Sequence, residues 1–275
     1  MMKTQSIYRK IARYCPQKHC RYILLVWGGV RIGKNSYISK KVNIGGNTNI
    51  GNNVMIQQAV SIGNNVCIGD NIKIYKSTQI GNNIRIMKEV EIQRNALIGD
   101  NVIIGKGAYI GVNASIRNAI IGDYTGIERN VFFTGVGSGK IRIGKESYIG
   151  INDILDWSDN ITIGDYVHIA GPSTGLWTHT SVPMCLNSIP LSQKGKKYRP
   201  TAPIVVEDNV YIGGNCTIYP GVTIHHHSII LPNSAVSKDV APFSMVGGCP
   251  ARAIKKVIIK DGKVSFEKLS DKKRS

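Results

Sequence analysis

The fold is decided by stretches such as Ile62-Gly-Asn-Asn-Val-Cys-Ile68-Gly-Asp-Asn-Ile-Lys-Ile74, in which an isoleucine returns every six residues. The spacing continues without a miss at Ile32, Ile38, Ile44, Ile50, Ile56, Ile62, Ile68, Ile74, Ile80, Ile86, Ile92, Ile98, Ile104, Ile110 and Ile116. A helix would bury a stripe with a period of 3.6 residues, and this pattern contains none. Small or β-branched residues often stand two positions before the isoleucines, which favours short alternating strands.

Asparagine often stands three residues after the isoleucine, where the chain must turn. It fills nine of the fifteen repeats, at Asn35, Asn47, Asn53, Asn65, Asn71, Asn83, Asn95, Asn101 and Asn113. Asparagine tolerates the left-handed backbone conformation better than most residues. Short strands joined by such corners wind into an all-β parallel β-helix with a core of stacked isoleucines. Because the phase recurs up to Val236, three hexads per turn predict about ten coils.

Composition limits the classes of function. The 275 residues carry 35 Lys and Arg against 17 Asp and Glu, a formal charge of +18, so anionic partners are favoured. The longest uncharged apolar stretch, 22–30, is less than half of the ~20 residues that span a bilayer. We therefore expect a cytoplasmic protein. Six cysteines without a CxxC pair argue against a disulfide framework and a zinc-thiolate site, and no recognised nucleic-acid motif occurs.

Four further segments carry a resemblance to a known family. They are Asp208-Asn-Val-Tyr-Ile-Gly-Gly-Asn215, Pro220-Gly-Val-Thr-Ile224, Ser237-Lys-Asp-Val240 and Gly248-Cys-Pro-Ala-Arg252. Together with the hexads they resemble the left-handed β-helix acyltransferases, in particular the sugar O-acetyltransferases. The general resemblance covers 32–254, and its sharper part covers 143–256. It implies a three-sided left-handed prism, a homotrimer with active sites between adjacent subunits, and acetyl-CoA as the donor.

We expect three parts in the chain. Residues 1–30 form a basic helix or arm that caps the open end of the rod, or alternatively contacts an anionic membrane. Residues 31–254 form the left-handed β-helix acyltransferase domain. Residues 255–275 form a hairpin around Asp261-Gly262 and a basic tail from Leu269 onwards.

Interruptions of the repeat are candidates for function. The glycine-rich segment 135–140 lacks the phosphate-loop pattern and is interpreted as a loop. The segment 152–160 is interpreted as a lateral excursion. The longest break, 176–203, has no periodicity and exceeds ordinary structural loops, so it should be extruded from one corner.

The extruded loop contains the candidate catalytic residue. His179 lies in a Trp177-Thr-His-Thr segment and matches the catalytic histidine of the sugar acetyltransferases. An imidazole can remove the proton of an attacking hydroxyl as general base. An isolated histidine in such a loop is otherwise an ordinary surface residue. Four basic residues follow in the loop, Lys194, Lys196, Lys197 and Arg199.

The resemblance also implies residues that bind the acceptor. Asn152 and Asp156 lie where the family carries an acceptor-binding Asn and Asp, Asp153 could replace either, and Trp177 is a further candidate. The competing interpretation is that the polar residues shape a bulge as Asx-turns.

For the donor, the resemblance places a backbone amide of Gly213-Gly214 near the thioester. Tyr211 stands where the family more often has Trp. Lys238 and Arg252 match the nucleotide end of coenzyme A, with Lys255 and Lys256 as helpers. Pro232 stands where the family usually has a small residue whose backbone N–H holds the pantetheine, and proline has no N–H. A donor other than acetyl-CoA therefore stays open as an alternative.

Two groups of histidines are candidates for binding a metal ion. The three side chains of His225–His227 should diverge at a corner, although symmetric copies in a trimer could still gather around a metal. His168 precedes a core isoleucine and should face outward, as a surface or subunit-contact residue. No metal cofactor is expected.

These observations favour an acetyl-CoA-dependent O-acetyltransferase acting on a carbohydrate, which the resemblance links to bacterial surface polysaccharide assembly. An N-acetyltransferase of a nucleotide-linked amino sugar and a non-catalytic β-helix scaffold remain alternatives. A γ-carbonic anhydrase would need three histidines converging on zinc, which His168 and His179 do not supply.

Overall fold

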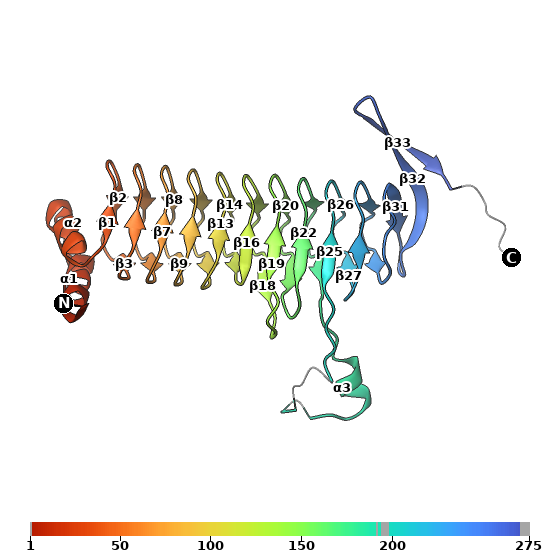
Figure 1. Cartoon of the computed structure of the whole chain (residues 1–275), viewed down its shortest axis with the longest axis horizontal. Coiled ribbons are helices and arrows are strands. Elements are labelled where there is room, and N and C mark those ends of the chain that lie inside the picture. The colour runs from red at the N-terminus through yellow and green to blue at the C-terminus, as the bar shows by residue number, and fades with distance from the viewer. Residues whose placement is uncertain (1, 191, 194–197, 270–275) are drawn as a thin grey trace. The chain divides into compact units, whose positions relative to one another are not determined.

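The structure is a computed structural model that describes residues 2–190, 192–193 and 198–269 (Figure 1). The chain divides into two compact units, 1–132 and 133–275, which are taken in turn. None of the described helices combines the length and the apolar character needed to cross a bilayer.

Unit 1 begins with two helices, α1 (Met2–Tyr14) and α2 (Lys18–Trp27). The Arg21 guanidinium of α2 donates to the Ile38 carbonyl at 2.8 Å. The Tyr22 hydroxyl donates to the Ser36 carbonyl and accepts from the Ile38 amide. The helical pair is thereby packed onto the first coil, where its buried Leu25 continues the apolar core.

The rest of unit 1 is a parallel β-helix with three sheets. The first sheet contains β1 (Arg31–Ile32), β4 (Asn49–Ile50), β7 (Cys67–Ile68), β10 (Arg85–Ile86), β13 (Ile103–Ile104) and β16 (Ala119–Ile121). The second contains β2 (Tyr37–Ile38), β5 (Met55–Ile56), β8 (Lys73–Ile74), β11 (Glu91–Ile92), β14 (Tyr109–Ile110) and β17 (Gly126–Ile127). The third contains β3 (Asn43–Ile44), β6 (Ser61–Ile62), β9 (Gln79–Ile80), β12 (Leu97–Ile98) and β15 (Ser115–Ile116), and β18 (Phe132–Thr134) begins at the end of the unit.

The register confirms the predicted coil of three hexads. Ile32 pairs with Ile50, and Ile50 pairs with Ile68, so each partner lies eighteen residues further along the chain. The isoleucines therefore stack directly on one another, and every one from Ile38 to Ile116 is buried. Burial of this apolar column is the main force that holds the coils together.

The corners also behave as predicted. All nine asparagines named above have positive φ, between 53° and 60°. Several bond to the equivalent amide of the next coil, as in the run from Asn47 through Asn65 and Asn83 to Asn101, with N···O distances of 2.9 to 3.2 Å. Asparagine thus supplies both the left-handed turn and a ladder of side-chain hydrogen bonds.

Unit 2 repeats the same three-sheet pattern. Its first sheet contains β19 (Ile141–Ile143), β22 (Ile161–Ile163), β25 (Ile204–Val206) and β28 (Thr223–Ile224). The second contains β20 (Tyr148–Ile149), β23 (His168–Ile169), β26 (Tyr211–Ile212), β29 (Ile229–Ile230), β31 (Ser244–Gly247), β32 (Arg252–Lys260) and β33 (Lys263–Lys268). The third contains β21 (Ile154–Asp156), β24 (Gly175–Leu176), β27 (Thr217–Ile218) and β30 (Ala235–Val236).

The chain ends in the predicted hairpin. β32 and β33 pair antiparallel, with Asp261 and Gly262 at the turn between the paired residues Lys260 and Lys263. The expected basic tail falls almost entirely in 270–275, outside the described residues.

One expectation about unit 2 is wrong. The segment 152–160 is no lateral excursion, because it contains β21, whose Leu155 is fully buried and pairs with Leu176. Leu155 lies six residues after Ile149 and keeps the hexad phase with a leucine in place of isoleucine. Only the residues after β21 widen the coil, and they carry the polar side chains of the site described below.

The extruded loop is present and leaves the coils of unit 2 after β24 (Figure 1). It contains a short helix that the sequence did not predict, α3 (Val182–Leu186). The two ends of the loop are joined by hydrogen bonds from Thr180 N to Pro200 O and from Ala202 N to Thr178 O. Lys194, Lys196 and Lys197 lie outside the described residues.

Candidate functional site

His179 stands at the base of the extruded loop, where the loop is most constrained. It forms an antiparallel bridge with Thr201, and its side chain is 21% exposed. The pairing therefore fixes the backbone at His179. A side chain held in this way can present one ring edge to a substrate with little loss of conformational entropy.

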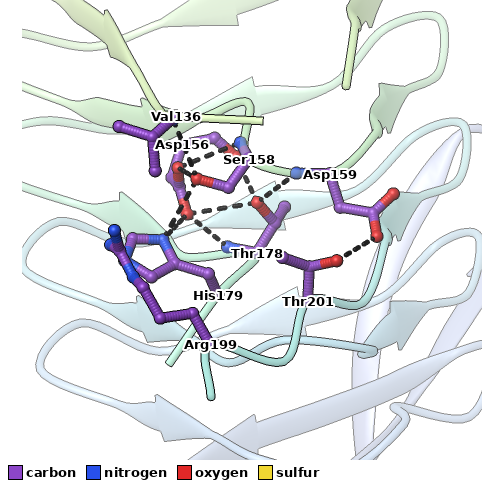
Figure 2. A network of polar contacts seen from close by, with 8 residues as sticks. All are labelled: Val136, Asp156, Ser158, Asp159, Thr178, His179, Arg199 and Thr201. Carbon is purple, nitrogen blue, oxygen red and sulfur yellow. Dashed lines mark hydrogen bonds and ion pairs between the residues drawn. The ribbon is translucent and has the colours of Figure 1, made fainter. Parts of the chain in front are cut away.

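The buried carboxylate of Asp156, at the end of β21, lies against His179 (Figure 2). Its Oδ2 is 2.6 Å from Nδ1 of His179 and accepts from the Thr178 amide at 3.0 Å. Its Oδ1 accepts from the Ser158 hydroxyl at 2.6 Å and from the Ser158 amide at 3.1 Å. Burial alone would raise the pKa of Asp156, but the hydrogen bonds from Ser158 and His179 hold that pKa below its ordinary value.

Asp156, a predicted acceptor-binding residue, lies buried against the imidazole of His179. The carboxylate has no exposed surface, and both of its oxygens are occupied by residues of the chain. It is therefore positioned to orient His179. Ser158 and Thr178 complete this arrangement. No sequence motif marks Ser158, and Thr178 belongs to the Trp177-Thr-His-Thr segment, which assigns it no role of its own.

The opposite ring nitrogen of His179 contacts Arg199. Nη2 of Arg199 is 2.7 Å from Nε2 of the imidazole. A guanidinium has only donors, so Nε2 must accept and Nδ1 must carry the proton that points to Asp156. Within the described part of the chain Arg199 forms no ion pair, and its Nε is buried without a hydrogen-bond partner. Arg199 thus fixes the same tautomer of His179 that Asp156 requires.

The glycine-rich loop 135–140 packs directly on the site. The Val136 amide donates to the Ser158 hydroxyl at 3.3 Å (Figure 2). A Cβ on Gly137 would lie 1.9 Å from the Ser158 carbonyl oxygen, so only glycine permits this approach. The expected loop is confirmed, and its glycines serve close packing against residues 157–159.

The other acceptor candidates are placed differently. Asn152 is an exposed corner residue with φ 61°. Asp153 is fully buried and accepts from the Gly150 and Thr174 amides at 2.9 and 2.8 Å. Desolvation raises the pKa of Asp153 to about 7 against the opposing effect of these two bonds. Trp177 is half-buried, and the missing side chain of Gly175 leaves room for its ring.

The two cations predicted for the nucleotide end of the donor lie together. Lys238 and Arg252 line one pocket of about 330 Å³, with Asp239 and Ser244 among its other lining residues. The pocket is formed where β32 turns back beside the last coil. Lys255 and Lys256 follow on β32, and Lys256 pairs with Ser244.

The residues predicted near the thioester lie on the corner after β26. Gly213 donates its amide to Ile230 in the sheet at 2.8 Å, so that N–H is already engaged. The Gly214 amide has no backbone partner among the described residues, and a Cβ there would lie 2.6 Å from the Gly171 carbonyl oxygen. Pro232 packs against Gly213 from the next coil, and Tyr211 is 42% exposed.

The histidines outside the loop make contacts of other kinds. His168 faces outward, as expected, and stacks between Tyr148 and Tyr211 at ring-centroid distances of 4.6 and 5.6 Å. At the 225–227 corner, His225 bonds to Glu207 at 2.9 Å, and the His227 ring stacks on Phe243. The described residues contain no group of three or more side chains arranged to hold a metal ion.

Comparison with known proteins gives two family matches and several relatives. The family described as bacterial transferase hexapeptide (six repeats) matches residues 203–238, and the family described as GMPPB C-terminal domain matches residues 53–137. Galactoside O-acetyltransferase of Escherichia coli is 34% identical over 149 residues, covering 54% of this chain and 69% of that protein. A protein of Saccharomyces cerevisiae named as an acetyltransferase is 32% identical over 130 residues, covering 47% and 62% of the two chains.

Among solved structures, an N-acyltransferase of Bacillus cereus in complex with an amino-deoxyglucose nucleotide and coenzyme A matches with a TM-score of 0.45. The identity is 20%, and the match covers 62% of this chain and 82% of that chain. The extent of the match to the galactoside enzyme, added to the hexad repeat, identifies the family. The chain belongs to the hexapeptide-repeat acyltransferases, the left-handed β-helix enzymes that its hexads resemble.

Proposed function

We propose that this chain transfers an acetyl group from acetyl-CoA to a hydroxyl of a carbohydrate, with His179 as the general base. The observation that carries the proposal is the contact between Nδ1 of His179 and the buried Asp156 carboxylate. That contact leaves the lone pair of Nε2 for a substrate hydroxyl once the Arg199 guanidinium, 2.7 Å away, is displaced.

The chemistry follows from this tautomer. Nε2 accepts the proton of the acceptor hydroxyl while the hydroxyl oxygen attacks the thioester carbonyl. The imidazolium formed is stabilised by the Asp156 carboxylate. When the tetrahedral species collapses, the carbon–sulfur bond breaks and the thiolate of coenzyme A takes the proton from Nε2. Because Arg199 lies on Nε2, the acceptor hydroxyl must displace its guanidinium before the reaction begins.

The residues assigned to the donor fit a phosphate-bearing cosubstrate in charge and in backbone geometry. Lys238 and Arg252 provide two cations in one pocket for the phosphate groups. The Gly214 amide is available as a donor to the developing oxyanion, and Gly213 and Tyr211 would border the pantetheine. Pro232 supplies no amide, so any hydrogen bond to the pantetheine at that corner must come from a neighbouring residue.

For the acceptor, Trp177 beside the base is the candidate for contact with the sugar, and exposed Asn152 is the candidate for a polar contact. We place the enzyme in the cytoplasm as a homotrimer in which the sites lie between subunits. The acceptor is a precursor of a bacterial surface polysaccharide.

The test is an acetylation assay. The protein is incubated with acetyl-CoA and a panel of neutral, acidic and amino sugars, and release of the free thiol is followed. The expected result is acceptor-dependent release of coenzyme A, with a product whose acetyl group is removed by mild base, as an ester is. A base-stable amide would indicate the N-acetyltransferase alternative. No release with any acceptor, from protein with native circular dichroism, would favour a scaffold.

A further inference from the structure

The two N-terminal helices have distinct sides. One side faces the first coil and contains the buried residues Ala12, Arg21 and Leu25. Arg9 donates to the Gly28 carbonyl and so ties α1 to the end of α2. The Lys41 amide donates to the Arg13 carbonyl, which ties α1 to the coil before β3. The opposite side of both helices is therefore directed away from the β-helix of unit 1.

That opposite side is apolar. On α1 it contains Ile7, Ile11 and Tyr14, spaced by four and three residues, and on α2 it contains Ile23, Val26 and Trp27. All six side chains are between 49% and 71% exposed. Residues with these spacings share one face of a helix. We call these six residues the outer helical face.

Every charged residue of α1 and α2 whose side chain the structure describes is basic. Lys10 and Arg13 of α1 are exposed, and the Arg13 guanidinium lies 5.5 Å from the centroid of the Tyr14 ring. The first 69 residues contain ten Lys or Arg and no Asp or Glu. Trp27 packs edge-on against Tyr8 with a centroid distance of 5.4 Å, which joins the two helices through aromatic rings of the kind found at membrane interfaces.

We propose that the outer helical face docks on a bilayer containing anionic phospholipid, with α1 and α2 lying in the headgroup region. A hydrophobic stripe flanked by Lys and Arg is the pattern of interfacial helices. The helices contain 13 and 10 residues, too few for the ~20 that would span the hydrocarbon core. An anionic surface matches the basic charge of the two helices. This preference for lipid charge goes beyond the acetyl transfer proposed above and does not depend on it.

The experiment is cosedimentation of the full chain with vesicles. One set contains phosphatidylcholine alone, and the other also contains phosphatidylglycerol. We expect at least ~10-fold stronger partitioning into the phosphatidylglycerol vesicles, weakened by raised ionic strength, since each basic residue near the surface contributes roughly fivefold. Equal binding to both vesicle types, or no binding to either, would overturn the proposal.

Two variants distinguish binding through the outer helical face from nonspecific hydrophobic binding to the vesicles. Ile11→Ser with Ile23→Ser should lose ~10-fold or more of the partitioning, because each buried apolar side chain contributes to membrane affinity. The matched control is Val264→Ser with Phe266→Ser on β33, which are also exposed, at 57% and 45%. The control should bind as the wild type does, and equal loss in both variants would contradict the assignment.

A second measurement tests whether another copy of the chain covers the outer helical face. The mass of the wild type and of the Ile11→Ser, Ile23→Ser variant in solution is compared, together with their thermal unfolding. The proposal expects the same oligomer and the same unfolding midpoint. A smaller species in the variant would show that the outer helical face joins copies of the chain, and the membrane proposal would then be wrong.

Discussion

The Nδ1 atom of His179 lies 2.6 Å from the Oδ2 atom of Asp156, across two successive coils of unit 2. The two residues are 23 positions apart in the chain, and the parallel pairing of β21 with β24 brings them together. The β-helix thus acts as a rigid support that sets the tautomer of a single loop histidine.

The role of Asp156 can be tested by Asp156→Asn. The new amide would donate to Nδ1 and move the ring proton to Nε2, so that the proposed base could no longer accept a proton there. We expect kcat to fall by about 10²- to 10⁴-fold with little change in the KM for acetyl-CoA. An unchanged kcat with a raised KM for the acceptor would instead show that Asp156 binds the sugar. Thermal unfolding of the variant is measured as a control for folding, because the substitution replaces one buried acceptor oxygen by a donor and so removes hydrogen bonds.

Arg199 should compete with the acceptor for Nε2. Arg199→Met keeps the aliphatic stem and removes the donors, so the acceptor no longer has to displace a guanidinium. We expect the KM for the acceptor to fall by roughly 10-fold or more, since a hydrogen bond to a charged group contributes ~1.5 to 3 kcal/mol, and we expect no loss of kcat. Arg142→Met, at an exposed position of β19, is the matched control. A large fall in kcat would mean that Arg199 acts in the transition state.

The period and the corners of the coils were readable in the sequence because each depends on one residue type at one position. Isoleucine fills the core and asparagine takes the left-handed turn, so the pattern repeats visibly. The position of His179 was recoverable only through resemblance to the family. The contacts of His179 with Asp156, Ser158 and Arg199 could not be predicted from the sequence. They arise from the stacking of the coils and from a loop without periodicity. Leu155 was missed for a simpler reason, since it replaces isoleucine in an otherwise acidic stretch.

Asp153 makes folding stability depend on pH. Its pKa in the folded chain is about 7, above the ordinary value of an aspartate, so the folded state binds the proton more tightly than the unfolded state does. The stability it contributes is fully present below about pH 4 and is lost as the pH rises to about 7. The side chain of the Asp153→Asn variant does not titrate, so this variant serves as the reference for the pH dependence of unfolding.

The measurement is the difference in unfolding free energy between the wild type and Asp153→Asn at a series of pH values. The wild type should lose on the order of 2 to 4 kcal/mol relative to the variant between about pH 4 and pH 8. A difference that is constant with pH would show that the buried carboxyl keeps its ordinary pKa.

The corners can be tested at Asn83, which has φ 56° and bonds to both Asn65 and Asn101. Asn83→Val places a β-branched residue in the left-handed region and should destabilise unit 1 by roughly 1 to 3 kcal/mol. Asn83→Gly keeps the turn and loses only the amide contacts, so it should cost less. The measurement compares the denaturant midpoints of the two variants. Equal midpoints would show that the positive φ at residue 83 does not affect stability.

The most direct test of the catalytic assignment is the rate of acetyl-CoA-dependent thiol release in His179→Ala, measured with the acceptor identified for the wild type. We expect a loss of about 10²- to 10⁴-fold with an unchanged oligomer and unchanged circular dichroism, while His225→Ala retains wild-type activity. Retention of wild-type turnover by a folded His179→Ala protein would contradict the account.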